Sequence, residues 1–286
     1  MVLIVDSGST KSDWIAVDKN GNKLLEKIRT KGLNPAILSK KKLSKIIRES
    51  KDLSENKDIV THVFFYGAGC GTENAKKLLS EVLEDIFPNA HVEVNEDTLA
   101  AVFATINHPK EAAVVCILGT GSNCSYWDGE NLHQRVKSLG YTLMDDASGN
   151  YYGKQLIRDY YFNHMPENEK VAFGAKYNMD ADYIKYNLYK QPSPNAYLAN
   201  FAEFMFLHKD SEYTTNLIKK GIRLFATNMI MQYKEELKTV PVHFAGSIAY
   251  FSQNEIREVA QEMGFKVGNF IRRPIDGLIP FHTNDM

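Results

Sequence analysis

The chain has 286 residues, of which 44% are hydrophobic and 24% are charged. These proportions are those of an ordinary globular protein, and the length fits two domains whose cores need no disulfide or structural metal. Lys and Arg number 34 against 35 Asp and Glu, a formal charge of −1. This balance argues against an attraction of the whole protein to nucleic acid or to anionic lipid.

Cysteine usage and the start of the chain both predict a cytoplasmic protein. Cys70, Cys116 and Cys124 show no CxxC spacing, which argues against a disulfide framework, a zinc ribbon or an iron–sulfur clip. We therefore expect reduced thiols. No basic region precedes the first apolar run, unlike a secretory signal. No apolar run reaches the roughly 18 residues of a membrane span, so no membrane partner is expected.

Short apolar runs alternate with amphipathic stretches, which indicates an α/β protein. Strands are predicted at residues 2–5 and 13–17, which would form a hairpin, and at residues 61–66, 91–94, 112–118 and 240–245. Helices are predicted at residues 73–86, 96–106 and 148–162, and residues 213–237 form the longest helical pattern.

Two further segments have simple structural interpretations. The basic run at residues 40–48 alternates with apolar residues at helical spacing, so we expect the solvated face of a helix rather than a nucleic-acid site. No aromatic residues interleave with it to stack on bases. The segment QPSPN at residues 191–195 is expected to be a surface connection.

An internal echo links two distant parts of the chain. With a shift of 113 residues, Gly8 falls on Gly121 and Trp14 falls on Trp127. Each copy consists of an apolar strand, a Gly-Ser turn, polar residues and a tryptophan. A match this short also arises by chance. We interpret it as two halves of similar design, each opening with a β-hairpin.

The first hairpin has the composition of a phosphate-binding turn. Its sequence is Asp6-Ser7-Gly8-Ser9-Thr10-Lys11. Glycine and small hydroxyl residues let backbone N–H groups approach an anion closely. Asp6, at the end of the strand, could hold Mg²⁺ through water beside the phosphates. The alternative is an ordinary tight hairpin with an aspartate facing solvent.

Two later turns have a similar character. Gly119-Thr120-Gly121-Ser122 directly follows an apolar strand, which suits a second phosphate cradle, and the two turns could clamp one polyphosphate. Ala245-Gly246-Ser247 would let a flat ring lie against backbone, with a helix starting near Ser252 or Asn254. The alternatives are a plain turn and a plain strand-to-helix loop.

In this order the three turns resemble the phosphate-1, phosphate-2 and adenosine motifs of the actin-like ATPase superfamily, which includes sugar kinases and Hsp70. The segments LGTGSNC (residues 118–124) and LGYTLMDDASG (residues 139–149) resemble, more narrowly, the N-acetylglucosamine kinase branch, which is grouped with the BadF/BadG/BcrA/BcrD ATPases. The resemblance covers nearly the whole chain. It implies two actin-like (ribonuclease H-like) domains with an interdomain nucleotide cleft, residues 1–108 on the sugar side and 109–286 on the nucleotide side.

The resemblance also implies individual site residues. Asp97 would take the proton of the attacking hydroxyl, and Asp6 would bind the metal. The implied nucleotide-binding residues are Gly8, Ser9, Thr10, Lys11, Gly119, Thr120, Gly121, Ser122, Gly246 and Ser247. The implied sugar-binding residues are Asn34, Gly69, Asp97, Gly140 and Asp145. Alternatively, Asp97 and the Asp145–Asp146 pair are acidic residues that a helix dipole favours at an N-terminus.

The chain departs from the family pattern in one segment and lacks two rival motifs. Where the family resembles GYLLGDEGSG, this chain has Met144, Asp146 and Ala147, which bears on the identity of the sugar more than on nucleotide binding. The glycines of residues 67–71 have the spacing GxGxG rather than the dinucleotide fingerprint GxGxxG, and no Walker A motif is present.

The resemblance therefore predicts an ATP-dependent kinase that phosphorylates an amino sugar, with N-acetylglucosamine as the first candidate and Mg²⁺ and ATP as cofactors. It is compatible with a homodimer and implies no nucleic-acid partner. One alternative is an ATPase that activates a partner enzyme. Such activators need cysteine ligands for an iron–sulfur cluster, and the sequence shows no suitable pair. The other alternative is a non-catalytic sugar sensor on the same fold.

Overall fold

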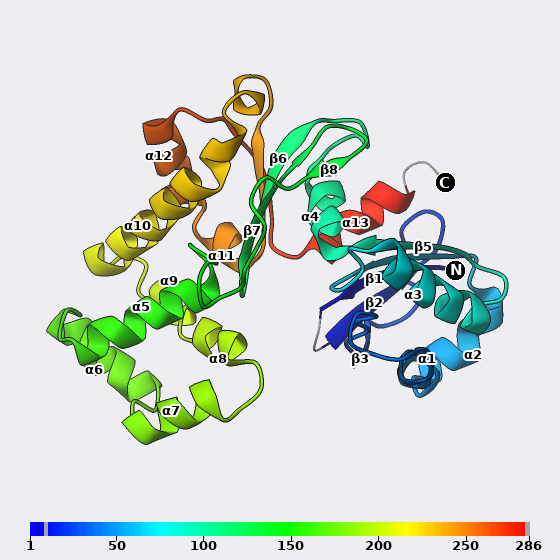
Figure 1. Ribbon diagram of the computed structural model, residues 1–286, viewed down its shortest axis with the longest axis horizontal. Coiled ribbons are helices and arrows are strands. Elements are labelled where there is room, and N and C mark those ends of the chain that lie inside the picture. The colour runs from blue at the N-terminus through cyan, green and yellow to red at the C-terminus, as the bar shows by residue number, and fades with distance from the viewer. Residues whose placement is uncertain (9–10, 284–286) are drawn as a thin grey trace. The chain divides into compact units, whose positions relative to one another are not determined.

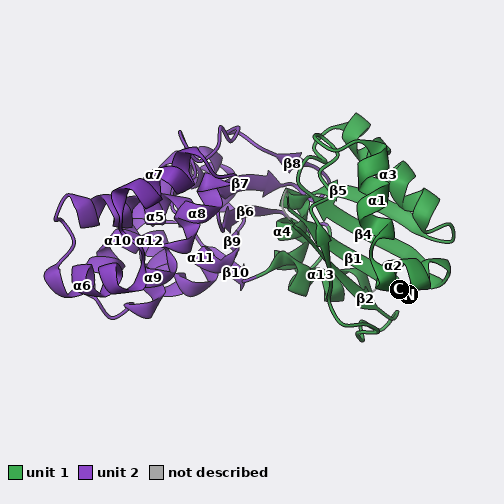
Figure 2. Cartoon of the chain, turned by 90° about the horizontal axis from the view of Figure 1, so that it is seen from below, with its two compact units in different colours: residues 1–109, 273–286 green, residues 110–272 purple. Residues whose placement is uncertain are grey.

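The computed structural model describes residues 1–8 and 11–283 and divides the chain into two compact units (Figures 1 and 2). Unit 1 comprises residues 1–109 and the chain from residue 273 onward, and unit 2 comprises residues 110–272. From the sequence, everything after residue 108 was expected to belong to the second domain. The C-terminal helix α13 (Pro274–Thr283) belongs to unit 1 instead, because its Ile275 and Leu278 are buried there with Val2 and Ile4.

Unit 1 is built on a five-stranded sheet of order β3-β2-β1-β4-β5. Its first three strands are antiparallel, and β4 and β5 run parallel to β1. The strands are β1 (Val2–Ser7), β2 (Lys11–Val17), β3 (Ile28–Lys31), β4 (His62–Gly67) and β5 (His91–Glu96).

Helices cover both faces of this sheet, and the residues of β1 alternate between them. Leu3 and Val5 are buried in a cluster with the apolar faces of α1 and α3, whereas Val2 and Ile4 are buried with α4 and α13. This alternation follows from the two-residue period of a strand. The helices are α1 (Lys40–Arg48), α2 (Lys51–Asn56), α3 (Glu73–Ile86) and α4 (Asp97–Thr105), with a 3₁₀ turn at Lys57–Ile59.

Helix α3 forms where the sequence predicted a helix, at residues 73–86. Its apolar residues recur at spacings of three and four, and Leu79, Val82 and Leu83 are buried on one face. The Thr72 hydroxyl accepts a hydrogen bond from the Ala75 N–H at 3.3 Å, which caps the first turn. The helix α1 likewise confirms the prediction of a basic, solvated helix face.

Unit 2 repeats the topology of unit 1. Its sheet has the order β10-β9-β6-β7-β8, in which β6, β7 and β8 are antiparallel and β9 and β10 run parallel to β6. The strands are β6 (Ala113–Leu118), β7 (Ser122–Trp127), β8 (Leu132–His133), β9 (Val242–Ala245) and β10 (Val267–Ile271). The prediction of two halves that each open with a hairpin is confirmed.

The shift of 113 residues, however, does not match the pairing of the strands. Trp14 lies opposite Val5 in the first hairpin, whereas Trp127 lies opposite Ala113 in the second. Next to the turn, Ser7 pairs with Ser12 in the first hairpin and Leu118 pairs with Ser122 in the second, so the two hairpins have different registers. The two tryptophans are therefore not structurally equivalent.

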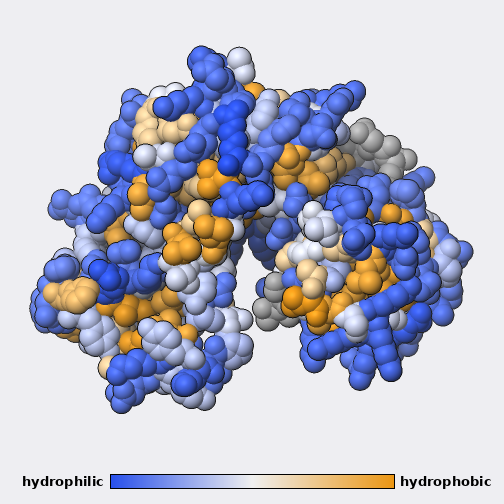
Figure 3. All heavy atoms as spheres, viewed as in Figure 1, coloured by the Kyte–Doolittle hydropathy of each residue, from blue (hydrophilic) through white to orange (hydrophobic). Residues whose placement is uncertain are grey.

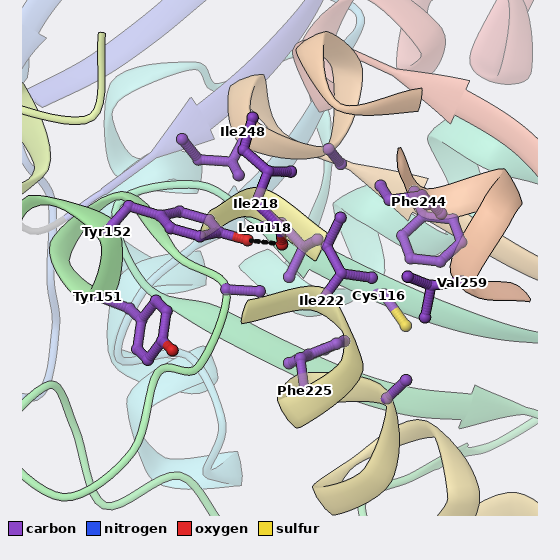
Figure 4. Packing of buried hydrophobic residues seen from close by; sticks show 14 of the residues in the cluster. Cys116, Leu118, Tyr151, Tyr152, Ile218, Ile222, Phe225, Phe244, Ile248 and Val259 are labelled. Carbon is purple, nitrogen blue, oxygen red and sulfur yellow. Dashed lines mark hydrogen bonds between the residues drawn. The ribbon is translucent and has the colours of Figure 1, made fainter. Parts of the chain in front are cut away.

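Unit 2 carries most of the helices and one continuous core. The helices are α5 (Gly149–Tyr161), α6 (Glu167–Lys176), α7 (Ala181–Tyr189), α8 (Pro194–Asn200), α9 (Glu203–Leu207), α10 (Glu212–Asn228), α11 (Ser247–Phe251) and α12 (Gln253–Met263). Figure 4 shows part of the core, where Tyr152 of α5 packs beside residues of α10 and its hydroxyl donates to the Ile218 carbonyl at 2.8 Å.

Two predictions about unit 2 were wrong in detail. The helical pattern at residues 213–237 breaks after Asn228 into 3₁₀ turns at Ile230–Tyr233 and Glu236–Lys238. There the buried Tyr233 hydroxyl reaches the carbonyls of Cys124 and His133, so tertiary contacts override the local pattern. The helix expected near residue 252 is confirmed as α12, and the short helix α11 precedes it. The expected connection at residues 191–195 overlaps α8, which begins at Pro194.

Polar side chains dominate the face of the molecule seen in Figure 3, with hydrophobic residues in small groups. Within the described part of the chain, every helix is too short or too polar to cross a membrane.

Candidate active site

The carboxyl ends of three parallel strands align at one edge of the unit 1 sheet. Ser7, Gly67 and Glu96 pair in register as the last residues of β1, β4 and β5. The turn after β1, the loop at residues 68–71 and the start of α4 all follow this edge. In open α/β sheets this is the edge where ligands bind.

Asp97 begins α4 directly after β5, with no connecting residue. Burial raises the pKa of the Asp97 carboxyl, while the backbone N–H groups of Thr98 and of Asp97 itself lower the pKa in opposition. A partly desolvated carboxylate of this kind is a better proton acceptor than one in water.

Asp6 lies near Asp97 and shares its electrostatic environment. Burial raises the pKa of Asp6 to about 6, the carboxylates of Asp97 and Asp13 add to the rise, and Lys11 opposes it. Asp13, opposite Asp6 in the hairpin, is itself balanced by Arg29 at 2.9 Å and a lysine at 3.3 Å. The Asp6–Asp97 pair therefore has an excess of negative charge that a cation would relieve.

The loop after β4 contacts the segment that contains Asn34. Gly69 has a φ of +83°, and a Cβ there would overlap the Asn34 side chain. The Asn34 Oδ1 accepts from the Ala36 N–H at 2.9 Å, which fixes the orientation of its amide. A Cβ at Gly71 would lie 3.5 Å from the Glu96 carboxylate. Glycines at these positions let the loop approach both polar side chains.

The turn of the first hairpin is closed at its base. The Gly8 N–H donates to the Lys11 carbonyl at 2.9 Å. The Ser7 hydroxyl lies 2.6 Å from that of Ser12 and accepts from the Leu33 N–H at 3.1 Å. The predicted phosphate-binding residues Ser9 and Thr10 lie outside the described residues.

The turn of the second hairpin leaves two backbone N–H groups available to a ligand. Its carbonyls are occupied, because the Gly149 N–H donates to Gly119 at 2.7 Å and the Asn150 N–H to Thr120 at 3.1 Å. The N–H groups of Thr120 and Gly121 have no acceptor among the residues that the structure describes. A turn with unpaired N–H groups is a cradle for an anion.

Asp145 lies against this turn. A Cβ at Gly121 would be 2.8 Å from the Asp145 Oδ2, and the same oxygen accepts from the Asn150 Nδ2 at 2.9 Å. Asp145 and Ala147 have φ values of +67° and +56°. The left-handed Ala147 explains why the family pattern favours glycine there. Gly140 lies in a separate turn, where a Cβ would meet nothing within 4 Å.

The third predicted motif borders a cavity within unit 2. Gly246 has a φ of +108°, and a Cβ there would overlap the Leu118 carbonyl, so β9 and β6 approach closely at this point. Ser247 lines a cavity of about 890 Å³. The cavity has an apolar lining with several cationic residues, and the Arg272 guanidinium lies 5.0 Å from the centre of the Phe251 ring. Its volume suits a ring-bearing ligand of nucleotide size.

Within each unit, the structure brings most of the described candidates together. In unit 1, Asp6, Asp97, Asn34 and Gly69 gather around the carboxyl edge of the sheet. In unit 2, Asp145 and Gly246 both adjoin the turn after β6. Sequence reasoning missed Glu96 and Asn150. Glu96 directly precedes a predicted site residue, and Asn150 directly follows the DDASG segment, so only their positions in the chain pointed to them.

The described residues include one close pair of thiols but no ready-made group of metal ligands. No group of three His, Cys, Asp or Glu side chains there is arranged to hold a metal ion. Cys116 and Cys124, which showed no pairing in the sequence, lie opposite each other with their Sγ atoms 3.5 Å apart. Both are buried and free, and burial raises the pKa of the Cys116 thiol.

No protein-family model matches the sequence, and a search of curated proteins finds no match. Solved structures do match. The crystal structure of a proposed N-acetylglucosamine kinase from Porphyromonas gingivalis is 32% identical, with a TM-score of 0.89 over 100% of this chain and 99% of that one. A proposed N-acetylglucosamine kinase from Chromobacterium violaceum is 13% identical, with a TM-score of 0.69 over 98% of both chains.

A more distant match extends the comparison of folds. A ROK family glucokinase from Streptomyces griseus, in complex with glucose and AMPPNP, is 14% identical, with a TM-score of 0.57 over 99% of this chain and 98% of that one. The two five-stranded sheets of this chain thus have the two-domain actin-like fold of sugar kinases. The chain belongs to the family of actin-like sugar kinases that includes the proposed N-acetylglucosamine kinase of Porphyromonas gingivalis.

Proposed function

We propose that this protein is an ATP-dependent kinase that phosphorylates an amino sugar, with N-acetylglucosamine as the first candidate. The observation that carries the proposal is the Asp97 carboxyl at the start of α4, whose charge raises the pKa of Asp6 and which follows the same edge of the sheet as the contact between Asn34 and Gly69. This grouping offers a proton acceptor beside polar groups that suit sugar hydroxyls. The 32% identity to a proposed N-acetylglucosamine kinase supports the choice of sugar.

The nucleotide would be held mainly by unit 2. The unpaired N–H groups of Thr120 and Gly121 would bind phosphate oxygens and stabilise charge on them during transfer. The base would occupy the cavity beside Ser247. Gly8 and Lys11 are the corresponding phosphate-binding candidates of unit 1. Mg²⁺, when bound, would neutralise phosphate charge, and Asp6 is the residue that we expect to hold it.

Each unit has candidate sugar-binding groups, and Asp97 would act on the sugar. Asn34 would exchange hydrogen bonds with its hydroxyls and Asp145 would accept hydrogen bonds from them, with Gly69 and Gly140 in the backbone around it. Asp97 would orient the attacking hydroxyl and take its proton, a contribution of roughly 10²–10⁴-fold to the rate. The rest of phosphoryl transfer depends on positioning and charge neutralisation.

The two alternatives make different demands on the structure. An activating ATPase needs accessible cysteine ligands, and Cys70, Cys116 and Cys124 are all buried. A non-catalytic sugar sensor would bind sugar without turnover. The departures from the family pattern at Met144, Asp146 and Ala147 are the feature that such a sensor would explain.

A panel of sugars with MgATP tests the proposal. We would measure ADP release and thermal shift with N-acetylglucosamine, glucosamine, N-acetylmuramate and glucose. Stabilisation scales as RT ln(1 + [L]/Kd), so the preferred sugar should give the largest shift and the fastest ADP release. Binding without ADP release would indicate the sensor instead, and neither binding nor release with any amino sugar would contradict the proposal.

The role of Asp97 is tested by Asp97→Asn. Because the amide cannot accept the hydroxyl proton, kcat should fall by roughly 10²–10⁴-fold while the Kd for nucleotide is unchanged. Glu73→Gln is the matched control, since Glu73 also begins a helix after a strand but its side chain is 91% exposed. The control should retain full activity. If Asp97→Asn keeps kcat within about threefold of the parent, Asp97 is not the base.

A further inference from the structure

We propose that Asn150 is a positioning residue that fixes the Asp145 carboxylate to the turn after β6. The inference rests on the proposed function, in which Asp145 contacts the sugar and the turn binds phosphate. Its consequence is that the sugar-binding carboxylate and the phosphate-binding turn of unit 2 keep one relative geometry.

The Asn150 side chain bridges the two elements directly. Its Nδ2 donates to the Thr120 carbonyl at 2.7 Å and to the Asp145 Oδ2 at 2.9 Å. Its backbone N–H donates to the same Thr120 carbonyl at 3.1 Å. The residue is 1% exposed, so water does not compete for these bonds. Hydrogen bonds from a buried amide to a carboxylate are among the stronger ones in proteins.

The segment that Asn150 holds has little preference of its own for the observed conformation. Asp145 and Ala147 both have left-handed backbone conformations although neither is glycine, and this conformation is unfavourable for L-residues. The backbone alone would therefore favour other conformations. The hydrogen bond from Asn150 to the Asp145 carboxylate favours the observed conformation. It holds Asp145 against Gly121, where a Cβ would lie 2.8 Å from the carboxylate.

The asparagine is itself firmly placed. It lies in the first turn of α5, whose Gly149 N–H donates to the Gly119 carbonyl at 2.7 Å. Two residues further along, Tyr152 is buried in the core and bonded to the Ile218 carbonyl at 2.8 Å (Figure 4). Asn150 is therefore held by a helix that packs into the hydrophobic core of unit 2.

The Asn150 side-chain amide acts here as a hydrogen-bond donor and not as an acceptor. The buried Oδ1 of Asn150 has no hydrogen-bond partner among the described residues, and an unsatisfied buried acceptor is costly. A smaller or apolar residue would avoid that cost. What only the amide supplies is one N–H group for each of two acceptors, the Thr120 carbonyl and the Asp145 carboxylate.

The test is a double-mutant cycle of Asn150→Ala with Asp145→Asn, followed by sugar-dependent ADP release. Because Asn150 acts through Asp145, Asn150→Ala should lower kcat/KM for the sugar by roughly 10- to 100-fold. The same change in the Asp145→Asn background should add less than about threefold. Asn228→Ala is the control, because Asn228 donates to the neighbouring Asp146 carboxylate at 2.9 Å, and it should keep parental kinetics.

A second variant, Asn150→Asp, preserves the shape of the side chain and gives a pH readout. Two carboxyl groups would then occupy the positions now joined at 2.9 Å, and they can bind tightly only when they share a proton. Its kcat/KM should fall below that of Asn150→Ala at pH 8 and recover as the pH falls toward about 6. A residue that only stabilises the fold would shift the melting temperature without this acid recovery.

The outcomes separate the inference from the function on which it rests. A parent protein without sugar-dependent ADP release contradicts the proposed function. A fully active parent overturns the inference alone if Asn150→Ala stays within about twofold, if the cycle is additive, or if Asn228→Ala loses as much activity. A non-additive cycle together with acid recovery of Asn150→Asp supports it.

Discussion

At the scale of single residues, the two neighbouring carboxyls of unit 1 show how a site can reduce stability. Partial burial raises the pKa of Asp6 to about 6, and the negative charges of Asp97 and Asp13 add to this rise. A carboxyl whose pKa is higher in the folded state favours folding when protonated. Its ionisation therefore removes stability as the pH rises from about 4 to about 6. A cation bound near Asp6 would offset this cost.

We predict that Asp6→Asn makes the protein more stable and inactive. At pH 8 the free energy of unfolding should rise by roughly 1–3 kcal/mol, because the buried charge is removed. Near pH 4 the difference should be small, since Asp6 is then protonated in the folded state and only partly ionised in the unfolded state. Urea denaturation at pH 4, 6 and 8 measures the effect.

Asp18→Asn provides a control of opposite sign. Asp18 accepts hydrogen bonds from Asn20 and Asn22, and the bonds from Asn22 lower its pKa most. Its ionised form therefore supports the fold above about pH 4, so its replacement should decrease stability at pH 8. Equal stability of Asp6→Asn and the parent at all three pH values would show that the carboxyl at position 6 is not under electrostatic strain.

At the scale of elements, the loop that leads into α5 shows how an unusual residue is tolerated. Ala147 is fully buried and left-handed, with a φ of +56°. Glycine would relieve about 1–2 kcal/mol of backbone strain. It would also lose about 0.8 kcal/mol from the buried methyl group and about 0.4–1 kcal/mol through the freer unfolded chain. These terms nearly cancel.

We therefore predict that Ala147→Gly changes the free energy of unfolding by less than about 1 kcal/mol, whereas Ala147→Val destabilises by more than about 2 kcal/mol because a β-branched residue is poorly accommodated at positive φ. Urea denaturation distinguishes them. Ala172→Gly in the middle of α6 is the control, and it should cost roughly 0.5–1 kcal/mol. A gain above about 2 kcal/mol for Ala147→Gly would mean that strain dominates.

The elements also show which features a sequence can predict. The range of α3 was predicted to the residue, because its apolar period, its Thr72 cap and the following proline all agree. The end of α10 was not, because a distant contact decides it: the Tyr233 hydroxyl bonds to strand backbone about 100 residues away in the chain. Asn150 was missed for a similar reason, since its partners become visible only when α5 meets the turn after β6.

At the scale of the whole molecule, the duplication was predictable and the return of the chain was not. Both units have the same strand order, and each begins with a hairpin whose apolar strand the sequence displays plainly. The return of α13 to unit 1 depends on complementary surfaces. Leu278 is fully buried with residues of β1 and α4. The His282 ring stacks on the Phe64 ring with 3.7 Å between their centres, and its Nε2 lies 2.7 Å from the Tyr66 hydroxyl.

We predict that α13 stabilises unit 1 selectively. Leu278→Ala should lower the free energy of unfolding of unit 1 by about 2–5 kcal/mol, because it removes a buried side chain and leaves a cavity. Hydrogen exchange should accelerate in β1 and α4, which pack against α13, while β6 and α10 in unit 2 keep their protection. Leu24→Ala is the control, since Leu24 lies in unit 1 but is 49% exposed, and its exchange should match the parent. If exchange rose equally in both units, the C-terminal helix would support the whole chain rather than unit 1. An unchanged pattern would instead mean that the sheet of unit 1 is stable without it.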